Sequence, residues 1–148
     1  MAAAARAAPC DGRGTSIVVD GKARRLWLCA GGASDGDFAV SLGRGGLGKA
    51  REGDGRTPRG RYPLGAPRAS KEYGTFIPVG YPTAAERARG LTGGAIGIHG
   101  PRRGFAFLGR ANAWADWTRG CIALATDGEI EKVARWVKSH ASAAVAIE

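Results

Sequence analysis

Short apolar runs separated by glycine-rich polar stretches dominate the first two thirds of the chain, a pattern typical of β-strands joined by turns. Residues 15–19 (TSIVV) and 22–29 (KARRLWLC) flank an Asp20-Gly21 pair, so they predict a β-hairpin closed by a type I′ turn. Proline cannot donate to a sheet ladder, so Pro63 indicates an edge or strand end for the strand that contains it. The further predicted strands are residues 37–41, 60–64, 75–79, 95–98 and 143–147.

Capping signals predict two helices. Thr83 and Glu86 have the spacing of a capping box, which begins a short helix reaching about Arg89. The same spacing at Thr126 and Glu129 precedes the longest predicted helix, at residues 127–139. One face of this helix carries apolar residues at helical spacing, which indicates core packing. These residues are Ile130, Val133, Ala134 and Val137. The chain is therefore predicted to be mainly β, with one principal helix near the C-terminus.

The composition indicates one folded domain. The chain has 148 residues, of which 44% are hydrophobic, 24% are charged and 25 are glycine. A chain of this length can bury a hydrophobic core that is stable without a metal ion or a disulfide. No apolar run approaches the length of a membrane-spanning helix. Residues 1–12 are alanine-rich and lack the apolar core of a secretory signal, so we expect a flexible segment there and the domain at residues 13–148.

Cys121 and His99 are the residues with the clearest catalytic chemistry. A thiol and an imidazole are the two groups that a cysteine acyl-transfer enzyme needs. Gly120 precedes Cys121, and a tight glycine turn there would expose the sulfur and direct backbone N–H groups at one point. His99 ends the apolar run 95–98, which would hold its ring at a strand end. The alternative is a small buried cysteine and a structural histidine, because free cysteines are commonly buried.

Other polar and aromatic residues have less specific signals. Asp116 could orient His99 as a third catalytic residue, or it could cap a turn. Trp114 and Trp117 flank it and are expected to pack, although one of them could line a substrate cleft. His140 ends the last helix, where an imidazole is favourable without any catalytic role. The spacing of the histidines and cysteines matches no metal-ligand cluster, and no glycine loop has the Lys-Ser/Thr ending of a phosphate site.

The other two cysteines, Cys10 and Cys29, could pair with each other. Counting back from the predicted Asp20-Gly21 turn places Cys29 opposite Gly12, one diagonal step from Cys10. A Cys10–Cys29 disulfide is therefore possible in an oxidising compartment, and it would leave Cys121 free. The alternative is a chain with three free thiols.

Three ordered segments resemble one known family. The segment 116–124 (DWTRGCIAL), with Ile98-His99-Gly100 upstream, is similar to the catalytic signature of the L,D-transpeptidase catalytic domain, the YkuD-like family. The segment 51–62 (REGDGRTPRGRY) resembles a second family segment, and the closing helix and strand resemble a third. The resemblance covers residues 13–148. It implies a single L,D-transpeptidase-like β-sandwich domain.

The resemblance also implies a reaction and its residues. In the family, a cysteine attacks the diamino acid–D-Ala bond of a peptidoglycan tetrapeptide stem, and the acyl-enzyme passes to an amine to form a 3→3 cross-link. Cys121 would be the nucleophile and His99 the general base and acid. The Gly120 and Cys121 N–H groups would bind the oxyanion, with Thr118 and Gly100 supporting the loop and the histidine. No cofactor is implied.

Departures from the family pattern leave alternatives open. Arg119 stands where many members have histidine, so it is assigned to loop support or to a stem carboxylate and not to proton transfer. Ala123 replaces a polar residue of some members, and the insert 102–114 lengthens the gap between histidine and cysteine, while Arg56 and Arg102 are expected near the cleft. An L,D-carboxypeptidase that uses water is one alternative. A noncatalytic basic cell-wall-binding module is another.

The chain is strongly basic, and the family resemblance implies where it acts. The net charge is +9, with arginines and lysines scattered through the predicted loops. No nucleic-acid-binding motif accompanies them, so no nucleic-acid partner is expected. An anionic cell-wall polymer suits the charge, and the expected partners are donor and acceptor stem peptides. The expected location is the cell envelope, periplasmic or extracytoplasmic, although no export signal is visible in the chain.

Overall fold

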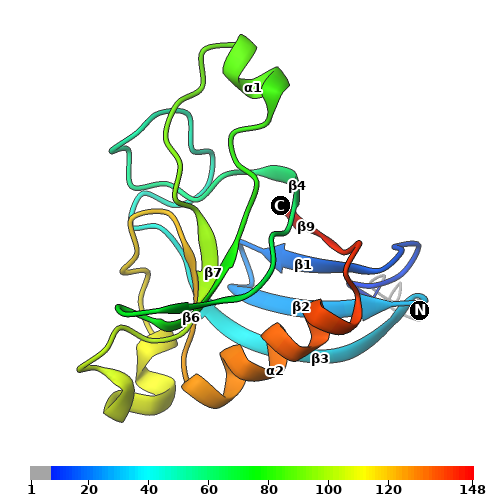
Figure 1. Ribbon diagram of the computed structural model, residues 1–148, viewed down its shortest axis with the longest axis vertical. Helices are drawn as coiled ribbons and strands as arrows, with labels where there is room; N and C mark the ends of the chain where they lie inside the picture. The colour runs from blue at the N-terminus through cyan, green and yellow to red at the C-terminus, as the bar shows by residue number, and fades with distance from the viewer. Residues whose placement is uncertain (1–7) are drawn as a thin grey trace, which may run out of the picture.

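The computed structural model describes residues 8–148, and within that range nine strands form one curled sheet (Figure 1). The order across the sheet is β4-β9-β1-β2-β3-β8-β7-β6-β5. The strands are β1 (Ser16–Asp20), β2 (Arg25–Ala30), β3 (Ala33–Ser41), β4 (Gly60–Pro63), β5 (Arg68–Ser70), β6 (Gly74–Pro78), β7 (Gly97–His99), β8 (Ile122–Leu124) and β9 (Ala144–Ile147). The helices are α1 (Ala84–Ala88), the 3-10 helix η1 (Ala106–Ala113) and α2 (Asp127–Ser139).

Strand β3 joins the two parts of the sheet. Most of β3 pairs with β2, whereas its last two residues, Val40 and Ser41, pair with β8. The first half of β3 is exposed and has no apolar alternation, which is why the sequence predicts a strand only at residues 37–41. The short strand β5 was missed for the same reason, because it is a polar edge strand of three residues.

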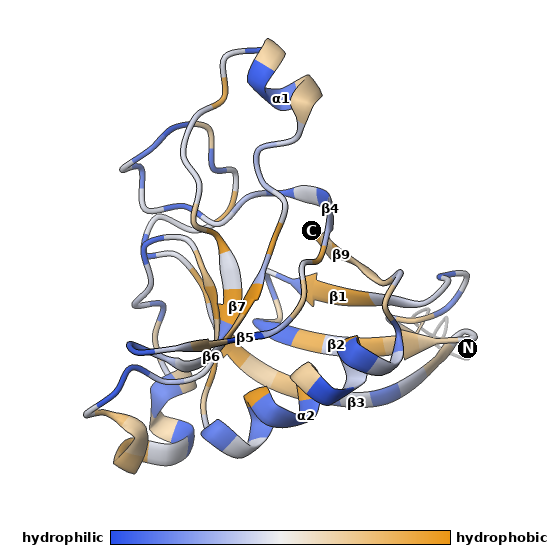
Figure 2. Ribbon diagram, viewed as in Figure 1, coloured by the Kyte–Doolittle hydropathy of each residue, from blue (hydrophilic) through white to orange (hydrophobic). Residues whose placement is uncertain are grey.

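Both parts of the sheet and α2 share one hydrophobic core. Ile17 from β1, Ile98 from β7 and Ile130 from α2 belong to the same buried cluster. All four predicted core residues of α2 are buried, and Trp136 joins them. Figure 2 shows the apolar strands converging on this core, with the hydrophilic face of α2 turned outward. The predicted mainly β domain with one principal C-terminal helix is confirmed.

The capping predictions differ in their outcome. At α1, Thr83 and Glu86 form the complete reciprocal capping box. At α2, the Thr126 side chain accepts from the Glu129 N–H, but the Glu129 carboxylate accepts from the Ala125 N–H instead of from Thr126. None of the helices within residues 8–148 is long and apolar enough to cross a bilayer.

The predicted turn of the first hairpin is wrong. Asp20 pairs with Arg25, so four residues form the turn, and Arg24 within it has a φ of 53°. The Asp20 carboxylate accepts hydrogen bonds from the N–H groups of Lys22 and Ala23, and this local bonding stabilises the longer turn. The register shifts accordingly, and Cys29 lies opposite Ser16 and not opposite Gly12.

A disulfide nevertheless joins Cys10 to Cys29. Residues 8–13 turn back onto β2, and both cysteines are buried beside Val18 and Trp27. Of the predicted flexible segment 1–12, residues 1–7 lie outside the described residues. Residues 8–12 are linked to strand β2 by the disulfide between Cys10 and Cys29.

Candidate active site

The register between β7 and β8 brings the two catalytic candidates together. These strands are parallel, with Ile98 beside Ile122 and His99 beside Ala123. Cys121 comes one residue before Ile122, so it shares a sheet face with His99, because side chains alternate between faces along a strand. The register therefore brings two residues that are 22 positions apart in sequence to the same face of the sheet, His99 at the end of β7 and Cys121 just before β8.

Thr118 braces the loop that leads to Cys121. Its hydroxyl donates to the Cys121 carbonyl oxygen at 2.7 Å and accepts from the Gly120 N–H at 3.1 Å. Its backbone is held from the other side by Leu42 and Arg44. Thr118 is almost completely buried, so the loop is fixed from within by one side chain. The Gly120 N–H, one of the two predicted oxyanion donors, is used in this bracing.

Glycine is required at position 120 for two reasons. Its φ is +142°, in a region that other residues rarely adopt. A Cβ there would also lie 2.7 Å from the Arg56 carbonyl oxygen and 3.0 Å from Ile96 Cδ1. The backbone of the glycine-rich loop that ends near Arg56 therefore packs directly against the nucleophile turn.

Asp54 organises this glycine-rich loop. Its carboxylate accepts hydrogen bonds from the N–H groups of Ala50, Arg51 and Arg56 and from the Lys49 ammonium. Burial would raise the pKa of Asp54, but these four hydrogen bonds hold it far below its usual range. The charged Asp54 therefore fixes the shape of the loop that packs against Gly120.

Lys49 is a buried cation that our sequence reasoning did not single out. Its ammonium lies 3.0 Å from an Asp54 carboxylate oxygen and 3.2 Å from the Arg51 carbonyl oxygen. Its side chain is only 4% exposed. The signal that could have identified it is its position just before the family-like segment 51–62.

His99 is fully buried and its two ring nitrogens differ. Nδ1 lies 2.7 Å from the Gly100 carbonyl oxygen, which assigns the proton to Nδ1. Nε2 is buried and has no hydrogen-bond partner among the described residues. Burial lowers the pKa of His99 to about 4, against the smaller opposing effects of the Gly100 carbonyl and the Glu72 charge. The imidazole is therefore neutral at pH 7, with Nε2 free to accept a proton.

Aromatic rings fix the plane of the imidazole. The Tyr73 ring stacks on His99 with centroids 3.7 Å apart and an interplanar angle of 15°. Trp117 and Phe76 lie farther away, with centroids at 5.9 and 6.2 Å. Our sequence reasoning missed Tyr73, because nothing in its local pattern distinguishes it from a packing residue. Gly100 completes the arrangement, since a Cβ there would lie 3.1 Å from the Tyr73 carbonyl oxygen.

Cys121 is the free cysteine of the described chain and is partly exposed. Its sulfur lies 3.4 Å from the Ala95 carbonyl oxygen, and no hydrogen bond joins it to the His99 ring. Burial raises the pKa of the Cys121 thiol, and the Gly97 N–H and the Lys49 charge only partly oppose this. The two side chains are thus a neutral thiol and a neutral imidazole.

Asp116 lies away from His99. Its Oδ1 accepts from the Leu42 N–H at 2.9 Å and from the Arg24 guanidinium at 3.0 Å. The structure therefore places Asp116 in support of the segment before the nucleophile turn and does not bring it to the imidazole. Arg119 is exposed beside Cys121.

Of the remaining residues considered from the sequence, some lie near the His99 ring and others do not. Trp117 donates to the Asn112 carbonyl oxygen and lies near His99, whereas Trp114 is 77% exposed. Arg102 is close enough to Tyr73 for its charge to oppose the rise in pKa that burial and Glu72 cause there. His140 contacts the Trp136 carbonyl oxygen through Nδ1 at the end of α2, as a structural residue would.

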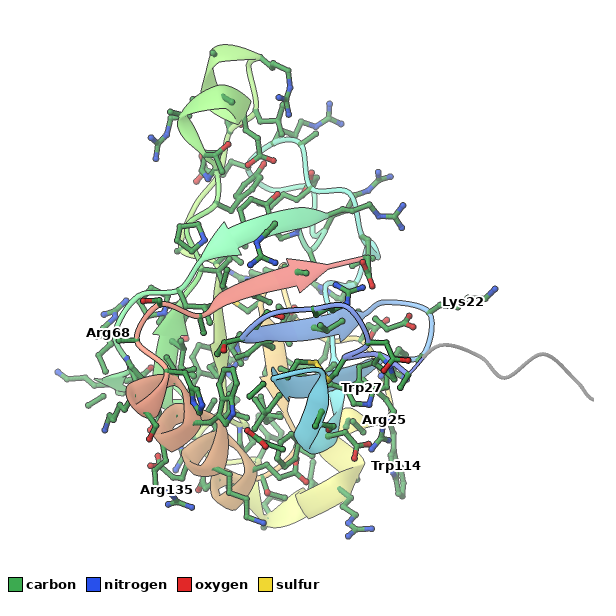
Figure 3. All side chains as sticks on the ribbon, turned by 90° about the vertical axis from the view of Figure 1, so that its right-hand side faces the viewer. Lys22, Arg25, Trp27, Arg68, Trp114 and Arg135 are labelled. Carbon is green, nitrogen blue, oxygen red and sulfur yellow. A yellow bond between two sulfur atoms is a disulfide. The ribbon has the colours of Figure 1, made fainter. Side chains whose placement is uncertain are left out.

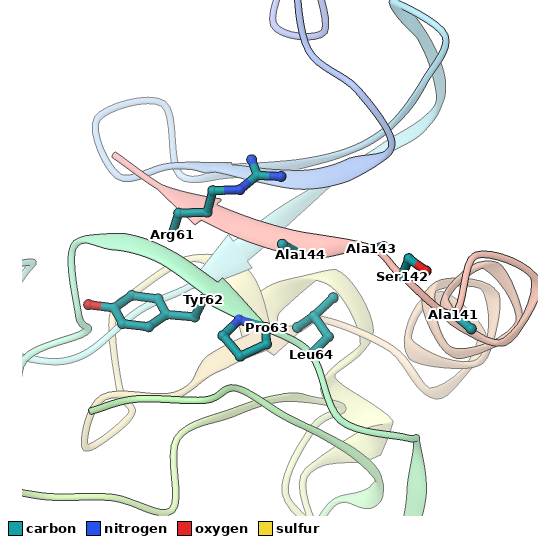
Figure 4. Close-up of a pocket in the computed structure, with 8 residues that line it drawn as sticks. All are labelled: Arg61, Tyr62, Pro63, Leu64, Ala141, Ser142, Ala143 and Ala144. Carbon is teal, nitrogen blue, oxygen red and sulfur yellow. The ribbon is translucent and has the colours of Figure 1, made fainter. Parts of the chain in front are cut away.

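One pocket of the surface lies away from the candidate site. The pocket in Figure 4, of about 410 Å³, lies between β4 and residues 141–144 and contains neither His99 nor Cys121. In the part of the chain that the structure describes, no group of three His, Cys, Asp or Glu side chains could hold a metal ion.

Comparisons with known proteins agree with this geometry. The helical cell shape determining protein Pgp2 from Campylobacter jejuni is 28% identical, with a TM-score of 0.73 over 89% of this chain and 46% of that chain. The L,D-transpeptidase from Mycobacterium smegmatis shares the fold at 15% identity and a TM-score of 0.57, over 89% of this chain and 57% of that chain. The catalytic domain of the E. faecium L,D-transpeptidase does so at 13% identity and a TM-score of 0.60, over 91% of this chain and 97% of that chain.

The chain thus spans about half the length of the Pgp2 structure. No curated protein matches it in sequence. The family model of the L,D-transpeptidase catalytic domain, YkuD, matches residues 14–145, which is nearly the whole described chain. The chain therefore belongs to the L,D-transpeptidase catalytic domain family.

Proposed function

We propose that this chain is a peptidoglycan L,D-transpeptidase that uses Cys121 as nucleophile and His99 as general base and acid. The observation that carries the proposal is the buried, unpartnered Nε2 of His99 on the same sheet face as the Cys121 thiol. A neutral imidazole next to a neutral thiol is the arrangement that a base-activated sulfur nucleophile needs. The substrate is a tetrapeptide stem of peptidoglycan.

The reaction proceeds in two steps. In the first, Nε2 of His99 takes the thiol proton, and the sulfur forms a bond to the carbonyl carbon between the diamino acid and D-Ala. The carbonyl oxygen becomes an oxyanion that the Cys121 N–H stabilises. His99 then gives its proton to the departing D-Ala amine, which leaves a thioester on Cys121.

In the second step, an amine of another stem attacks the thioester carbonyl. His99 accepts the proton of that amine, and the sulfur leaves as the new amide bond forms. The proton returns to the sulfur, which restores the thiol and the neutral imidazole. No cofactor takes part in this sequence.

Two features beyond the pair support an envelope substrate. Arg119 is exposed beside Cys121, and a guanidinium can bind a stem carboxylate in bidentate fashion. The Cys10–Cys29 disulfide suits a protein that works in an oxidising compartment outside the cytoplasm. We therefore place the chain in the cell envelope, with stem peptides as donor and acceptor.

An L,D-carboxypeptidase is the second candidate function. Water would replace the amine in the second step, and the similarity to the cell shape determining protein Pgp2 gives a reason to test it. The two activities share the acyl-enzyme and differ only in how well the acceptor side excludes water. The two activities are therefore distinguished by their reaction products, because both would use the same arrangement of Cys121 and His99.

The decisive experiment incubates the protein with purified disaccharide-tetrapeptide and identifies products and protein adducts by mass spectrometry. Cys121→Ala and His99→Ala are compared with His140→Ala, a matched control at the structural histidine. Cross-linked dimer that requires Cys121 and His99 supports transpeptidation. Tripeptide alone assigns the chain to carboxypeptidases. Folded protein that gives neither product nor adduct, yet sediments with cell walls, would indicate a noncatalytic binding module.

A further inference from the structure

The large apolar side chains that are exposed in the described chain all lie in one stretch, residues 105–114. Phe107 is 81% exposed and Trp114 is 77% exposed, and Phe105 and Leu108 are also exposed. Single exposed apolar residues are common on protein surfaces, but such a concentration marks an interaction site. We name these four residues, together with Arg102 and Arg110, the insert surface.

The base of this segment is firmly held. The buried Asn112 side chain donates to the carbonyl oxygens of Phe105 and Ala125. The Ser41 hydroxyl lies 2.8 Å from the Asn112 carbonyl oxygen and 2.7 Å from that of Ala115. The exposed aromatic side chains therefore project from a fixed support. In Figure 3, Trp114 lies at the periphery of the molecule.

The charge of the segment is uniformly positive. Residues 101–115 contain three arginines and no aspartate or glutamate. Arg103 is paired with Asp127 of α2. Arg102 and Arg110 are exposed, and within residues 8–148 their guanidinium groups form no ion pair or hydrogen bond. Two free cations thus belong to the same short segment as the four exposed apolar side chains.

We propose that the insert surface docks on an anionic lipid bilayer. Aromatic side chains are favoured at the boundary between headgroups and acyl chains, where apolar rings are buried to a shallow depth. Arginines in the same segment are attracted to anionic headgroups, and residues 101–115 themselves contain no carboxylate that would oppose this attraction. The net charge of +9 acts in the same direction over longer distances.

Docking in this manner goes beyond the proposed reaction. The insert connects β7, which carries His99, to β8, which follows Cys121. A bilayer bound to the insert would therefore hold the candidate site at a fixed height and orientation relative to the membrane surface. The binding itself needs neither His99 nor Cys121, so it can be tested without any assay of activity.

The test measures sedimentation of the 148-residue chain with vesicles of equal parts phosphatidylglycerol and phosphatidylcholine, and with vesicles of phosphatidylcholine alone. Three double variants are compared. The first, Phe107→Ser with Trp114→Ser, removes the exposed rings. The second, Arg102→Gln with Arg110→Gln, removes the free cations. The third, Lys22→Gln with Arg135→Gln, is a control that removes equal charge from exposed positions elsewhere.

We expect binding to the anionic vesicles that falls about tenfold or more in each insert variant and changes little in the control. Thermal unfolding midpoints should stay equal, since all six side chains are exposed. Equal loss in the control, or no loss when the rings are removed, would mean general cationic adsorption and overturn the proposal. Absent vesicle binding would also overturn it, as would a soluble dimer that disappears in the ring variant.

Discussion

The Arg24 guanidinium donates to the Asp116 carboxylate at 3.0 Å, across 92 positions of the chain. The same carboxylate oxygen accepts from the N–H of the buried Leu42. This contact fastens the turn of the first hairpin to the segment that leads into Cys121.

Replacing Asp116 with alanine should lower the free energy of unfolding by about 1–3 kcal/mol, because the Leu42 N–H then loses its acceptor in a buried position. Urea denaturation measures the change. Asp116→Asn keeps an oxygen for that N–H and should cost less. Equal stability of the alanine variant and the wild type would show that the Asp116 contact contributes nothing.

Gly120→Ala should destabilise the nucleophile turn. A Cβ at this position approaches the Arg56 carbonyl oxygen to 2.7 Å, and the φ of +142° is unfavourable for alanine. We expect a loss of about 1–3 kcal/mol in the free energy of unfolding and a loss of thioester formation. Gly31→Ala is the matched control, because Gly31 has a φ of +59° and no atom lies within 4 Å of the position that an alanine Cβ would take there. A control that costs as much as Gly120→Ala would refute the role of the Arg56 contact.

His99 should make the stability of the protein depend on pH between about 6.5 and 4. Its folded pKa of about 4 lies below the ordinary value of 6.5, so the unfolded state binds this proton first as the pH falls. The contribution is fully present above pH 6.5 and is lost on the way down to pH 4, by about 3 kcal/mol.

Denaturation of the wild type and of His99→Gln at pH 7 and pH 4.5 measures this effect. The free energy of unfolding of His99→Gln should fall less between the two values. A wild type and a His99→Gln variant with equal slopes would contradict the neutral, buried imidazole.

The Cys10–Cys29 disulfide should determine how many thiols react before reduction, and it should stabilise the folded protein. Denatured but unreduced protein should react at one thiol and reduced protein at three, because Cys121 is the free cysteine. The sequence separation of 19 residues corresponds to about 3 kcal/mol of stabilisation in the chain-entropy model, so Cys10→Ser with Cys29→Ser should unfold at lower urea. Cys121→Ser should leave the midpoint nearly unchanged. Three reactive thiols before reduction would rule out the bridge.

Local patterns predicted several elements correctly. Helix α2 has its predicted bounds, because a cap and an apolar face at helical spacing are both written in consecutive residues. The capping box at Thr83 is complete for the same reason. The first hairpin shows the limit of such reasoning. Its Asp-Gly pair favours a two-residue turn, but the Asp20 side chain bonds to the following backbone and stabilises a four-residue turn instead.

The sequence by itself determined which residues carry chemistry, since a thiol and an imidazole in family-like segments identify Cys121 and His99 as candidates. Only the tertiary structure decided how they are arranged. The parallel register of β7 and β8 brings them to one face, stacking on Tyr73 fixes the plane of the imidazole, and burial lowers its pKa so that it stays neutral. It also directed Asp116 to Arg24 instead of to His99. These outcomes depend on contacts between residues far apart in the chain, and such contacts leave no periodic signal in the sequence.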